Sequence, residues 1–313
     1  MPNDRGNDPD NDQGKGKQTM KLANVHNRPT LVVDDGIIDV ADASLGRFGS
    51  FESIFSRWED FCAWARGIDP VAIVPAPDAF GPAVPRPRQV IGVGFNYAAH
   101  VGEAAALVDG TTANMLPLVF AKLPTSITGP TGEIALPDNR TDYEVELVVA
   151  IGTRADQVAA ADAWSHVAGL MVGQDISSRG VQFLKPEQHC VGKSFRTFSP
   201  LGPYLVTPDE LPDPDNLMLR CWVNGELRQK ASTREMIYGV AELIELLSAV
   251  TALEPGDLIF TGTPAGVGGL EDPPRYLAPG DVIASEIEGL GRMENRCVPA
   301  RPAQGVGARW HTS

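Results

Sequence analysis

The last two-thirds of the sequence is a series of short apolar runs, each closed within a few residues by glycine or proline. This pattern constrains the fold more than any other feature. The runs are QVIGVG (89–94), LVFAKL (118–123), EVELVVAIG (144–152), AGLMVGQDIS (168–177), LMLRCWVNG (217–225), DLIFTG (257–262) and DVIASEIEG (281–289). Such lengths and turn signals are typical of strands, whereas helical patterns are confined to NYAAHVGEAA, AADAWSHV and TREMIYGVAELIELLSAV. The pattern predicts a strand-rich barrel or sandwich rather than alternating β-α-β units.

The first 85 residues form a different region. Residues 1–19 contain little that a core could bury, so we expect a disordered tail there. TLVVDDGIIDVADA (30–43) predicts a hairpin turning at Asp-Gly, and SFESIFSRWEDFCAWARG (50–67) predicts a helix with Ser50 as its N-cap. Proline-rich VPAPDAFGPAVPRPRQ (74–89) is typical of a linker. The expected organisation is therefore a tail over 1–19, a small N-terminal domain and linker over 20–85, a large domain over 86–300 and a C-terminal tail over 301–313.

Composition narrows the choice of partners and compartment. The chain has 26 Lys and Arg against 40 Asp and Glu, a net charge of -14. Nucleic acid and anionic membranes attract basic surfaces, so neither is expected as a partner. The four cysteines form no Cys-x-x-Cys pair, which argues against a zinc ribbon or a disulfide scaffold. No apolar run reaches membrane-spanning length and the first twenty residues lack a signal-peptide pattern, so the cytoplasm is the expected compartment.

Three acidic residues could share one cation. In DYEVELVVAIG (142–152), Glu144 and Glu146 would point to the same side of a strand, although alternation of Glu with Val by itself favours a solvent-exposed face. Asp175 follows an apolar run, where a strand leaves the core. Three converging carboxylates would repel one another unless a cation joined them. An all-oxygen ligand set suits Mg²⁺, Mn²⁺ or Ca²⁺ rather than Zn²⁺.

A second group of residues could carry acid–base chemistry. His100 and Glu103 are three residues apart, so on a helix they would share a face, either as a surface pair or as a base oriented by a carboxylate. Lysines beside apolar residues usually snorkel to solvent, and Lys122 and Lys193 have such neighbours. The glycine-rich FTGTPAGVGG (260–269) is either a hairpin turn or a loop that presents backbone N–H groups and the Thr263 hydroxyl to a carboxylate.

The order of these motifs resembles the fumarylacetoacetate hydrolase family. The matching blocks are GxNYxxHxxEA (94–104), FxK (120–122), TDYEVELVVAIG (141–152), GQDISSRGVQ (173–182), GKSFRTFSPLGP (192–203), FTGTPAGVG (260–268) and LxPGDVIxxEIEGLGxxxN (277–295). The resemblance covers about residues 88–298. It implies a mixed α+β, strand-rich fold, with a β-roll or barrel C-terminal domain and a small α+β N-terminal domain, and it implies a homodimer.

The resemblance also implies roles for individual residues. Implied metal ligands are Glu144, Glu146 and Asp175. Implied catalytic residues are His100 and Glu103, on a mobile segment that closes over substrate, and Lys122. Implied substrate-binding residues are Arg179, Gln182, Lys193 and Thr263. The chain departs from the family pattern at Arg196, where Asp is common, at Ser178-Arg179-Gly180, and in KPEQHC (185–190).

These roles favour metal-dependent hydrolysis of a carbon–carbon bond in an acylpyruvate or related 2,4-dioxo acid, with Mg²⁺ or Mn²⁺, and Ca²⁺ as a further option. The same site would serve an oxaloacetate-type decarboxylase or a 2-hydroxydienedioate isomerase, because fold and metal site are shared. A metal-binding module without turnover is a third reading. Retention of both His100 and Glu103 places hydrolysis first.

Overall fold

The structure is a computed structural model that describes residues 20–68, 73–104 and 116–310. The larger of its two main sheets contains β1 (Lys21–Val25), β2 (Arg28–Val33), β3 (Gly36–Asp39), β4 (Val90–Gly94), β5 (Leu118–Ala121), β6 (Ile127–Thr128), β9 (Val145–Ile151), β10 (Val167–Gln174), β12 (Ser199–Val206) and β15 (Leu258–Phe260). The smaller contains β7 (Ile134–Leu136), β13 (Met218–Val223), β14 (Glu226–Ser232), β16 (Val282–Ile287) and β17 (Gly291–Pro299). A separate pair joins β8 (Thr141–Asp142) to β11 (Ser177–Ser178).

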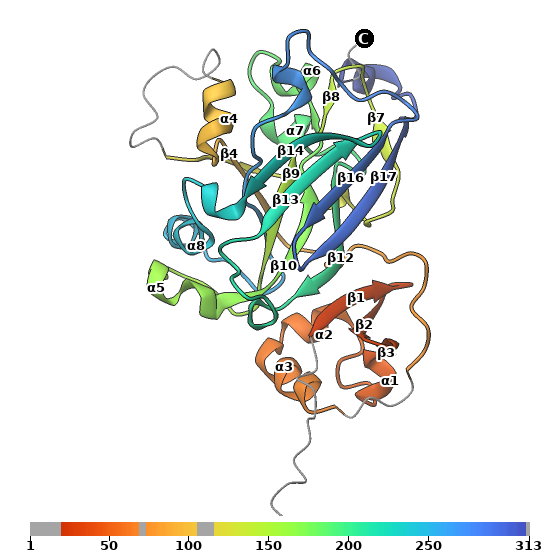
Figure 1. Ribbon diagram of the computed structural model, residues 1–313, viewed down its shortest axis with the longest axis vertical. Coiled ribbons are helices and arrows are strands. Elements are labelled where there is room, and N and C mark those ends of the chain that lie inside the picture. The colour runs from red at the N-terminus through yellow and green to blue at the C-terminus, as the bar shows by residue number, and fades with distance from the viewer. Residues whose placement is uncertain (1–19, 69–72, 105–115, 311–313) are drawn as a thin grey trace, which may run out of the picture.

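The helices are short and lie around the sheets (Figure 1). The α-helices are α1 (Val40–Ala43), α2 (Phe51–Phe55), α3 (Trp58–Arg66), α4 (Ala98–Glu103), α5 (Ala160–Ala163), α6 (Arg179–Gln182), α7 (His189–Gly192) and α8 (Val240–Ser248). The 3-10 turns are η1 (Pro124–Ser126), η2 (Trp164–His166), η3 (Pro208–Glu210), η4 (Thr233–Glu235), η5 (Gly268–Leu270) and η6 (Gly305–Trp310). Of the helices in the described ranges, none is long and apolar enough to cross a membrane.

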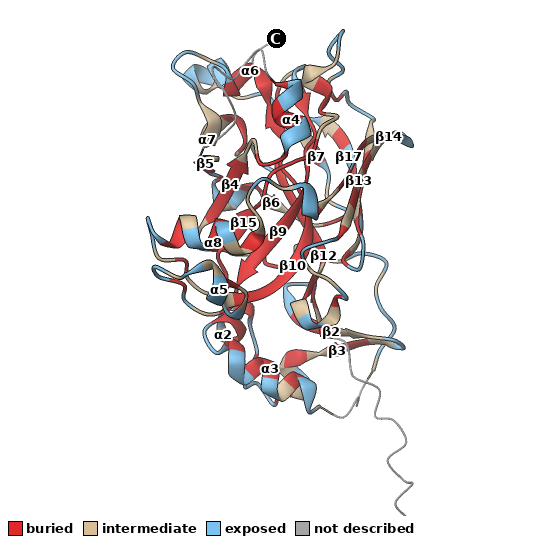
Figure 2. Cartoon of the chain, turned by 60° about the vertical axis from the view of Figure 1, so that its left-hand side comes forward, coloured by how far each residue is buried: buried red, intermediate tan, exposed pale blue. Residues whose placement is uncertain are grey.

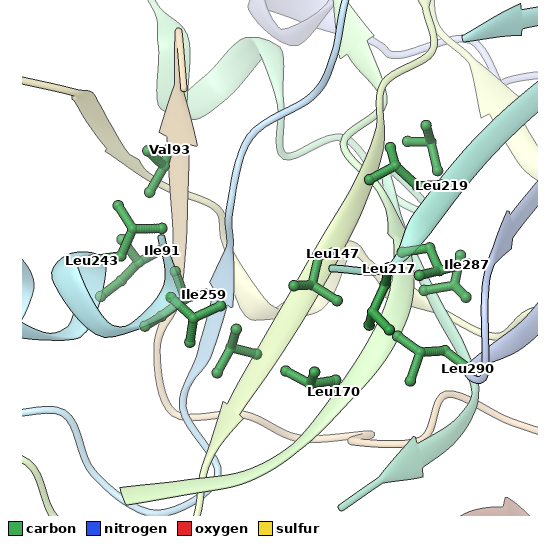
Figure 3. Packing of buried hydrophobic residues seen from close by; sticks show 14 of the residues in the cluster. Ile91, Val93, Leu147, Leu170, Leu217, Leu219, Leu243, Ile259, Ile287 and Leu290 are labelled. Atoms are coloured by element: carbon green, nitrogen blue, oxygen red, sulfur yellow. The ribbon is translucent and has the colours of Figure 1, made fainter. Parts of the chain in front are cut away.

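The strand-rich mixed fold is confirmed. The larger sheet runs in the order β3-β2-β1-β12-β10-β9-β15-β4-β5 and the smaller in the order β14-β13-β16-β17-β7. Neither order closes on itself within the described parts of the chain. Apolar residues of both sheets, among them Leu147, Leu170, Leu219 and Ile287, form one core between them (Figure 3). Each such buried side chain stabilises the fold by roughly 1.5–3 kcal/mol relative to an exposed one.

Strand β9 lies at the centre of the larger sheet, between β10 and β15, and all seven of its residues are buried. Figure 2 shows it in the buried interior of the molecule. The expectation of a solvent-exposed face, drawn from its alternating Glu and Val, is therefore wrong, because layers of the protein cover both faces of this strand. The expected strand over 142–152 is also interrupted, since Tyr143 and Glu144 lie between β8 and β9.

The N-terminal region continues the larger sheet. Strand β1 pairs antiparallel with β12, so that Lys21 lies opposite Val206. Its helices cover the lower end of the sheet in Figure 1, and their apolar residues share a core with β9, β10 and β15. The proposed tail over 1–19 lies outside the described residues.

Local sequence signals in the N-terminal region predicted the β2–β3 hairpin and helical structure over 50–67. Ser50 caps α2 as predicted, its hydroxyl accepting a hydrogen bond from the Ser53 N–H. The single helix predicted for 50–67 is instead broken into α2 and α3 around Ser56 and Arg57. The β2–β3 hairpin turns at Asp34-Asp35, and Gly36 is already paired with Val33.

Candidate metal and substrate site

Three carboxylates meet where β9 begins and β10 ends. These strands are antiparallel neighbours, so the residues before β9 and after β10 lie at the same end of the sheet. The Asp175 N–H donates to the Glu144 carbonyl at 2.8 Å, and this hydrogen bond joins the segment before β9 to the segment after β10. Ligand oxygens of Glu144, Glu146 and Asp175 all lie within 4.8 Å of one another, and all three residues are buried. The structure therefore brings together the three acids that the sequence suggested as ligands.

Both lysines point into this cluster. Lys193 Nζ lies 2.7 Å from Glu144 Oε2 and 2.5 Å from Asp175 Oδ2. Lys122 Nζ donates to Asp175 and, at 2.6 Å, to the Lys193 carbonyl. Lys122 is 1% exposed and Lys193 4% exposed. The usual snorkelling of lysine beside apolar residues does not occur here, because buried carboxylates offer each ammonium group an ionic partner.

Arg179, the first residue of α6, closes another side of the cluster. Its guanidinium donates to Asp142 Oδ2 at 2.9 and 3.0 Å, to Glu144 Oε1 at 2.6 Å and to Gln182 Oε1 at 2.9 Å. Asp142 also accepts from the N–H groups of Gly268 and Gly269, each at 2.9 Å. Sequence reasoning missed Asp142. Its position two residues before Glu144 was the available signal.

The charges of the cluster do not balance. With every group ionised, the four carboxylates (Asp142, Glu144, Glu146 and Asp175) exceed the three cations (Lys122, Arg179 and Lys193) by one negative charge. Burial opposes ionisation of Glu144, but Lys193 and Arg179 outweigh it and hold the pKa of this carboxyl well below its usual range. Burial raises the pKa of Glu146 well above its usual range, and the charges of Asp175 and Glu144 add to this. Glu146 is thus the acid that most lacks a cation.

The donor set fits a hard divalent cation. The three ligands supply only carboxylate oxygens, which Mg²⁺, Mn²⁺ and Ca²⁺ prefer. One oxygen of Glu146 accepts from the Gly262 N–H at 2.9 Å, and no cationic side chain in the described residues forms a salt bridge with this carboxylate. A cation among the three ligands would relieve the repulsion that raises the pKa of Glu146.

His100 and Glu103 lie on α4, at the same end of the molecule as α6 (Figure 2). His100 Nδ1 is 3.4 Å from Glu103 Oε2, and the imidazole is largely buried. The Phe95 ring stacks on it at 5.9 Å between centroids, and Phe95 has a φ of 57°, in the left-handed region that residues other than glycine seldom adopt. The Glu103 carboxylate also accepts from the Gly266 N–H at 2.9 and 3.1 Å. Glu103 therefore ties α4 to the glycine-rich loop.

The glycine-rich loop over 260–269 is tied to β9. The Thr263 hydroxyl donates to the Val145 carbonyl at 2.9 Å and accepts from Gln229 Nε2 at 2.8 Å. Gln229 Oε1 in turn accepts from the Val145 N–H at 2.9 Å. The hydroxyl proton of Thr263 thus already forms a hydrogen bond with the Val145 carbonyl, and contact of this hydroxyl with substrate stays a prediction. Gln229, on the distant strand β14, carried no sequence signal.

The segment that departs from the family pattern touches the site. Gln182 Nε2 lies 3.2 Å from His189 Nδ1, while Gln182 Oε1 accepts from Arg179. His189 Nε2 is 3.4 Å from Glu187. Residues of KPEQHC therefore orient the Gln182 amide. Arg196, the other departure, is exposed and borders a separate cavity of about 590 Å³.

Comparison with known proteins agrees with this architecture. Residues 89–298 match the family model described as fumarylacetoacetate (FAA) hydrolase C-terminal. The chain belongs to the fumarylacetoacetate hydrolase family.

The names of its relatives in that family describe several different activities. The chain is 44% identical over 218 residues to oxaloacetate tautomerase FAHD2B, mitochondrial, of Bos taurus, covering 69% of this chain and 68% of the relative. It is 33% identical to the solved fumarylacetoacetate hydrolase of Exiguobacterium antarcticum (TM-score 0.77; 91% of this chain and 100% of that chain covered). It is 28% identical to maleylpyruvate hydrolase of Sphingobium sp. SYK-6, solved with manganese(II) ion and pyruvate (TM-score 0.72; 90% and 100% covered). The names include hydrolases and a tautomerase, so membership fixes an enzyme family and leaves the reaction open.

Proposed function

We propose that the chain is a divalent-metal hydrolase that cleaves a carbon–carbon bond in an acylpyruvate or related 2,4-dioxo acid. The observation that carries the proposal is the pairing of His100 with Glu103 on α4. Glu103 accepts a hydrogen bond from the Gly266 N–H of the glycine-rich loop, and the Gly262 N–H of the same loop donates to Glu146. A carboxylate beside one ring nitrogen raises the basicity of the other and so favours proton abstraction from water.

Charge supports an anionic substrate. With a divalent cation added, the cluster of four carboxylates and three basic side chains changes from one net negative charge to one net positive charge. Such a site attracts a carboxylate, and it remains close to neutral once the carboxylate is bound. The pyruvate and manganese(II) ion in the structure of maleylpyruvate hydrolase are consistent with the same pairing.

The protein groups have separate roles in the proposed reaction. When bound, the cation supplies a Lewis acid that polarises the 2-oxo group of the substrate. His100 takes a proton from water, and the resulting hydroxide adds to the distal carbonyl, whose oxyanion Lys122 stabilises. The carbon–carbon bond then breaks, its electrons pass to the enolate of pyruvate, and protonation at carbon completes the products. Lys193 offsets negative charge, and Arg179 and Gln182 hold the substrate.

The test is a panel of 2,4-dioxo acids and oxaloacetate with Mg²⁺ or Mn²⁺, assayed together for acid release, CO₂ release and isomer formation. His100→Ala should lower hydrolysis about 10²–10⁴-fold, the usual effect of losing a general base, while Mn²⁺ affinity is retained. His166→Ala is the matched control, because this half-buried histidine contacts Thr153, away from the three acids. Full hydrolysis by His100→Ala would exclude the proposed base.

Oxaloacetate chemistry is the second candidate function, favoured by the 44% identity to a protein named oxaloacetate tautomerase. Tautomerisation needs proton transfer between carbon and oxygen but no attacking water, and decarboxylation needs only stabilisation of the enolate. Decarboxylation should therefore suffer less than hydrolysis in His100→Ala. Rapid isomerisation of oxaloacetate without acid release from any 2,4-dioxo acid would favour this second candidate.

A further inference from the structure

Gly266 of the glycine-rich loop is held at both of its backbone polar groups. Its N–H donates to the two carboxylate oxygens of Glu103, at 2.9 and 3.1 Å, and its carbonyl accepts from the Tyr143 hydroxyl at 3.1 Å. These two groups belong to the peptide units on either side of one Cα atom, whose φ is +102°. The hydrogen bonds therefore fix the direction of the Gly266 N–H, and with it the carboxylate that pairs with His100.

The Tyr143 hydroxyl is in turn fixed by Arg228 of β14. Arg228 Nε donates to Tyr143 Oη at 2.9 Å, and the guanidinium lies over the Tyr143 ring, 5.9 Å from its centroid. The Arg228 side chain is 6% exposed and Tyr143 is 1% exposed, so water competes little for this bond. Because the hydroxyl oxygen accepts from Arg228, its single proton is directed to the Gly266 carbonyl.

Arg228 is held at further points. Its terminal nitrogens pair with Glu271, which directly follows η5, and with Glu226 of β14 at 3.1 Å. Its main chain also lies close to the loop, because a Cβ added to Gly266 would be 2.1 Å from the Arg228 carbonyl oxygen. The guanidinium is therefore a fixed connection between β14 and the glycine-rich loop rather than a solvated surface group.

We infer that Arg228 is a positioning residue for the proposed base, acting through Tyr143, Gly266 and Glu103 on the orientation of His100. The inference rests on the proposed function. None of the hydrogen bonds that connect these residues includes a side chain of the three acids of the metal site. Loss of Arg228 should therefore disturb the base while metal and substrate binding are retained. A displacement of about 1 Å at a reacting group can lower a rate roughly 100-fold.

The experiment measures kcat and KM for hydrolysis of a 2,4-dioxo acid by the Mn²⁺-loaded protein. Arg228→Met should lower kcat about 10–100-fold, with KM and Mn²⁺ affinity unchanged. Tyr143→Phe should have a similar effect on kcat. Because this second variant keeps the buried ring and removes only the hydroxyl, it tests the same connection with little risk to the fold.

Arg275→Met is the matched control. Arg275 pairs with the same two acids as Arg228, with Glu226 at 3.0 Å and with Glu271 at 3.9 Å, but the donor to the Tyr143 hydroxyl is Arg228. The control removes the same charge from the same surface and should leave kcat unchanged. An equal loss of kcat in Arg275→Met and Arg228→Met would overturn the inference.

A double variant distinguishes positioning of the base from a general effect on the fold. If Arg228 acts through His100, then Arg228→Met should cause no further loss of hydrolysis in His100→Ala, because the base that it positions is absent. Losses that multiply in the double variant would mean that Arg228 acts by another route, and would overturn the inference.

Failure of the inference can be distinguished from failure of the proposed function. If no 2,4-dioxo acid is hydrolysed, amide hydrogen exchange at Gly266 still tests the connection. This N–H should exchange about tenfold faster in Arg228→Met and Tyr143→Phe than in the wild type or in Arg275→Met, since its hydrogen bond to Glu103 is weakened. Faster exchange would support the positioning of Glu103 even if the protein catalyses another reaction. Unchanged exchange with unchanged kcat would overturn the inference and leave the hydrolase intact.

Discussion

Replacement of Arg179 by methionine tests whether the buried ion network stabilises the fold. The substitution keeps the length of the side chain but removes its charge and its donors to Asp142, Glu144 and Gln182. Neither acid loses all of its partners. Asp142 still accepts hydrogen bonds from the N–H groups of Gly268 and Gly269, and Glu144 still pairs with Lys193. We therefore expect the low end of the usual cost of breaking a buried pair, about 3 kcal/mol.

The assay is thermal unfolding of the metal-free protein, in which this loss lowers Tm by roughly 6–12 °C. Removing the guanidinium changes the cluster from one to two net negative charges, so saturating Mn²⁺ should raise Tm more in Arg179→Met than in the wild type. Arg154→Met is the matched control, because Arg154 also pairs with two carboxylates but is 54% exposed. It should lower Tm by less than about 2 °C. Equal shifts in the two variants would refute the reasoning.

Three further predictions concern the metal, the loop and the assembly. Chelation with EDTA should abolish turnover and Mn²⁺ should restore it, and a metal-free preparation with full activity would contradict the role of the three acids. Gly266→Ala should cost about 1–3 kcal/mol and reduce activity, because Gly266 has a φ of +102° and an added Cβ would lie 2.1 Å from the Arg228 carbonyl oxygen. Gly102→Ala, with open space around it, should instead be neutral or stabilising in the same unfolding assay. Light scattering at micromolar concentration should give twice the 33.4 kDa chain mass if the protein is a homodimer, and a single-chain mass would exclude this.

Sequence patterns predicted local features well where the signal is contained in neighbouring residues. Turn residues and short apolar runs predicted a strand-rich fold, and Ser50 was correctly expected to cap a helix. Spacing within DYEVE, together with the position of Asp175 after an apolar run, was enough to suggest three acids around a cation. The order of the motifs indicated the protein family, which the periodicity of apolar residues alone could not have indicated.

Other features depend on contacts between distant parts of the chain. The part that Asp142 plays in the site depends on Arg179, which binds it from α6, and Gln229 contacts Thr263 only through the register of β14. The burial of Lys122 was hidden for the same reason, because its carboxylate partner is Asp175, on another element. No local pattern could show which strands become neighbours.

The pairing of β1 with β12 and of β4 with β15 has a consequence for biosynthesis. Because translation proceeds from the N-terminus, β1 leaves the ribosome long before β12 (Ser199–Val206) has been made. Strand β4 must likewise wait for Leu258–Phe260, although β9 and β10 can already have formed their hairpin. Such non-local pairing slows folding and leaves strand edges open meanwhile. The larger sheet is thus completed only after most of the chain has been synthesised, and its inner strands have unpaired edges until then.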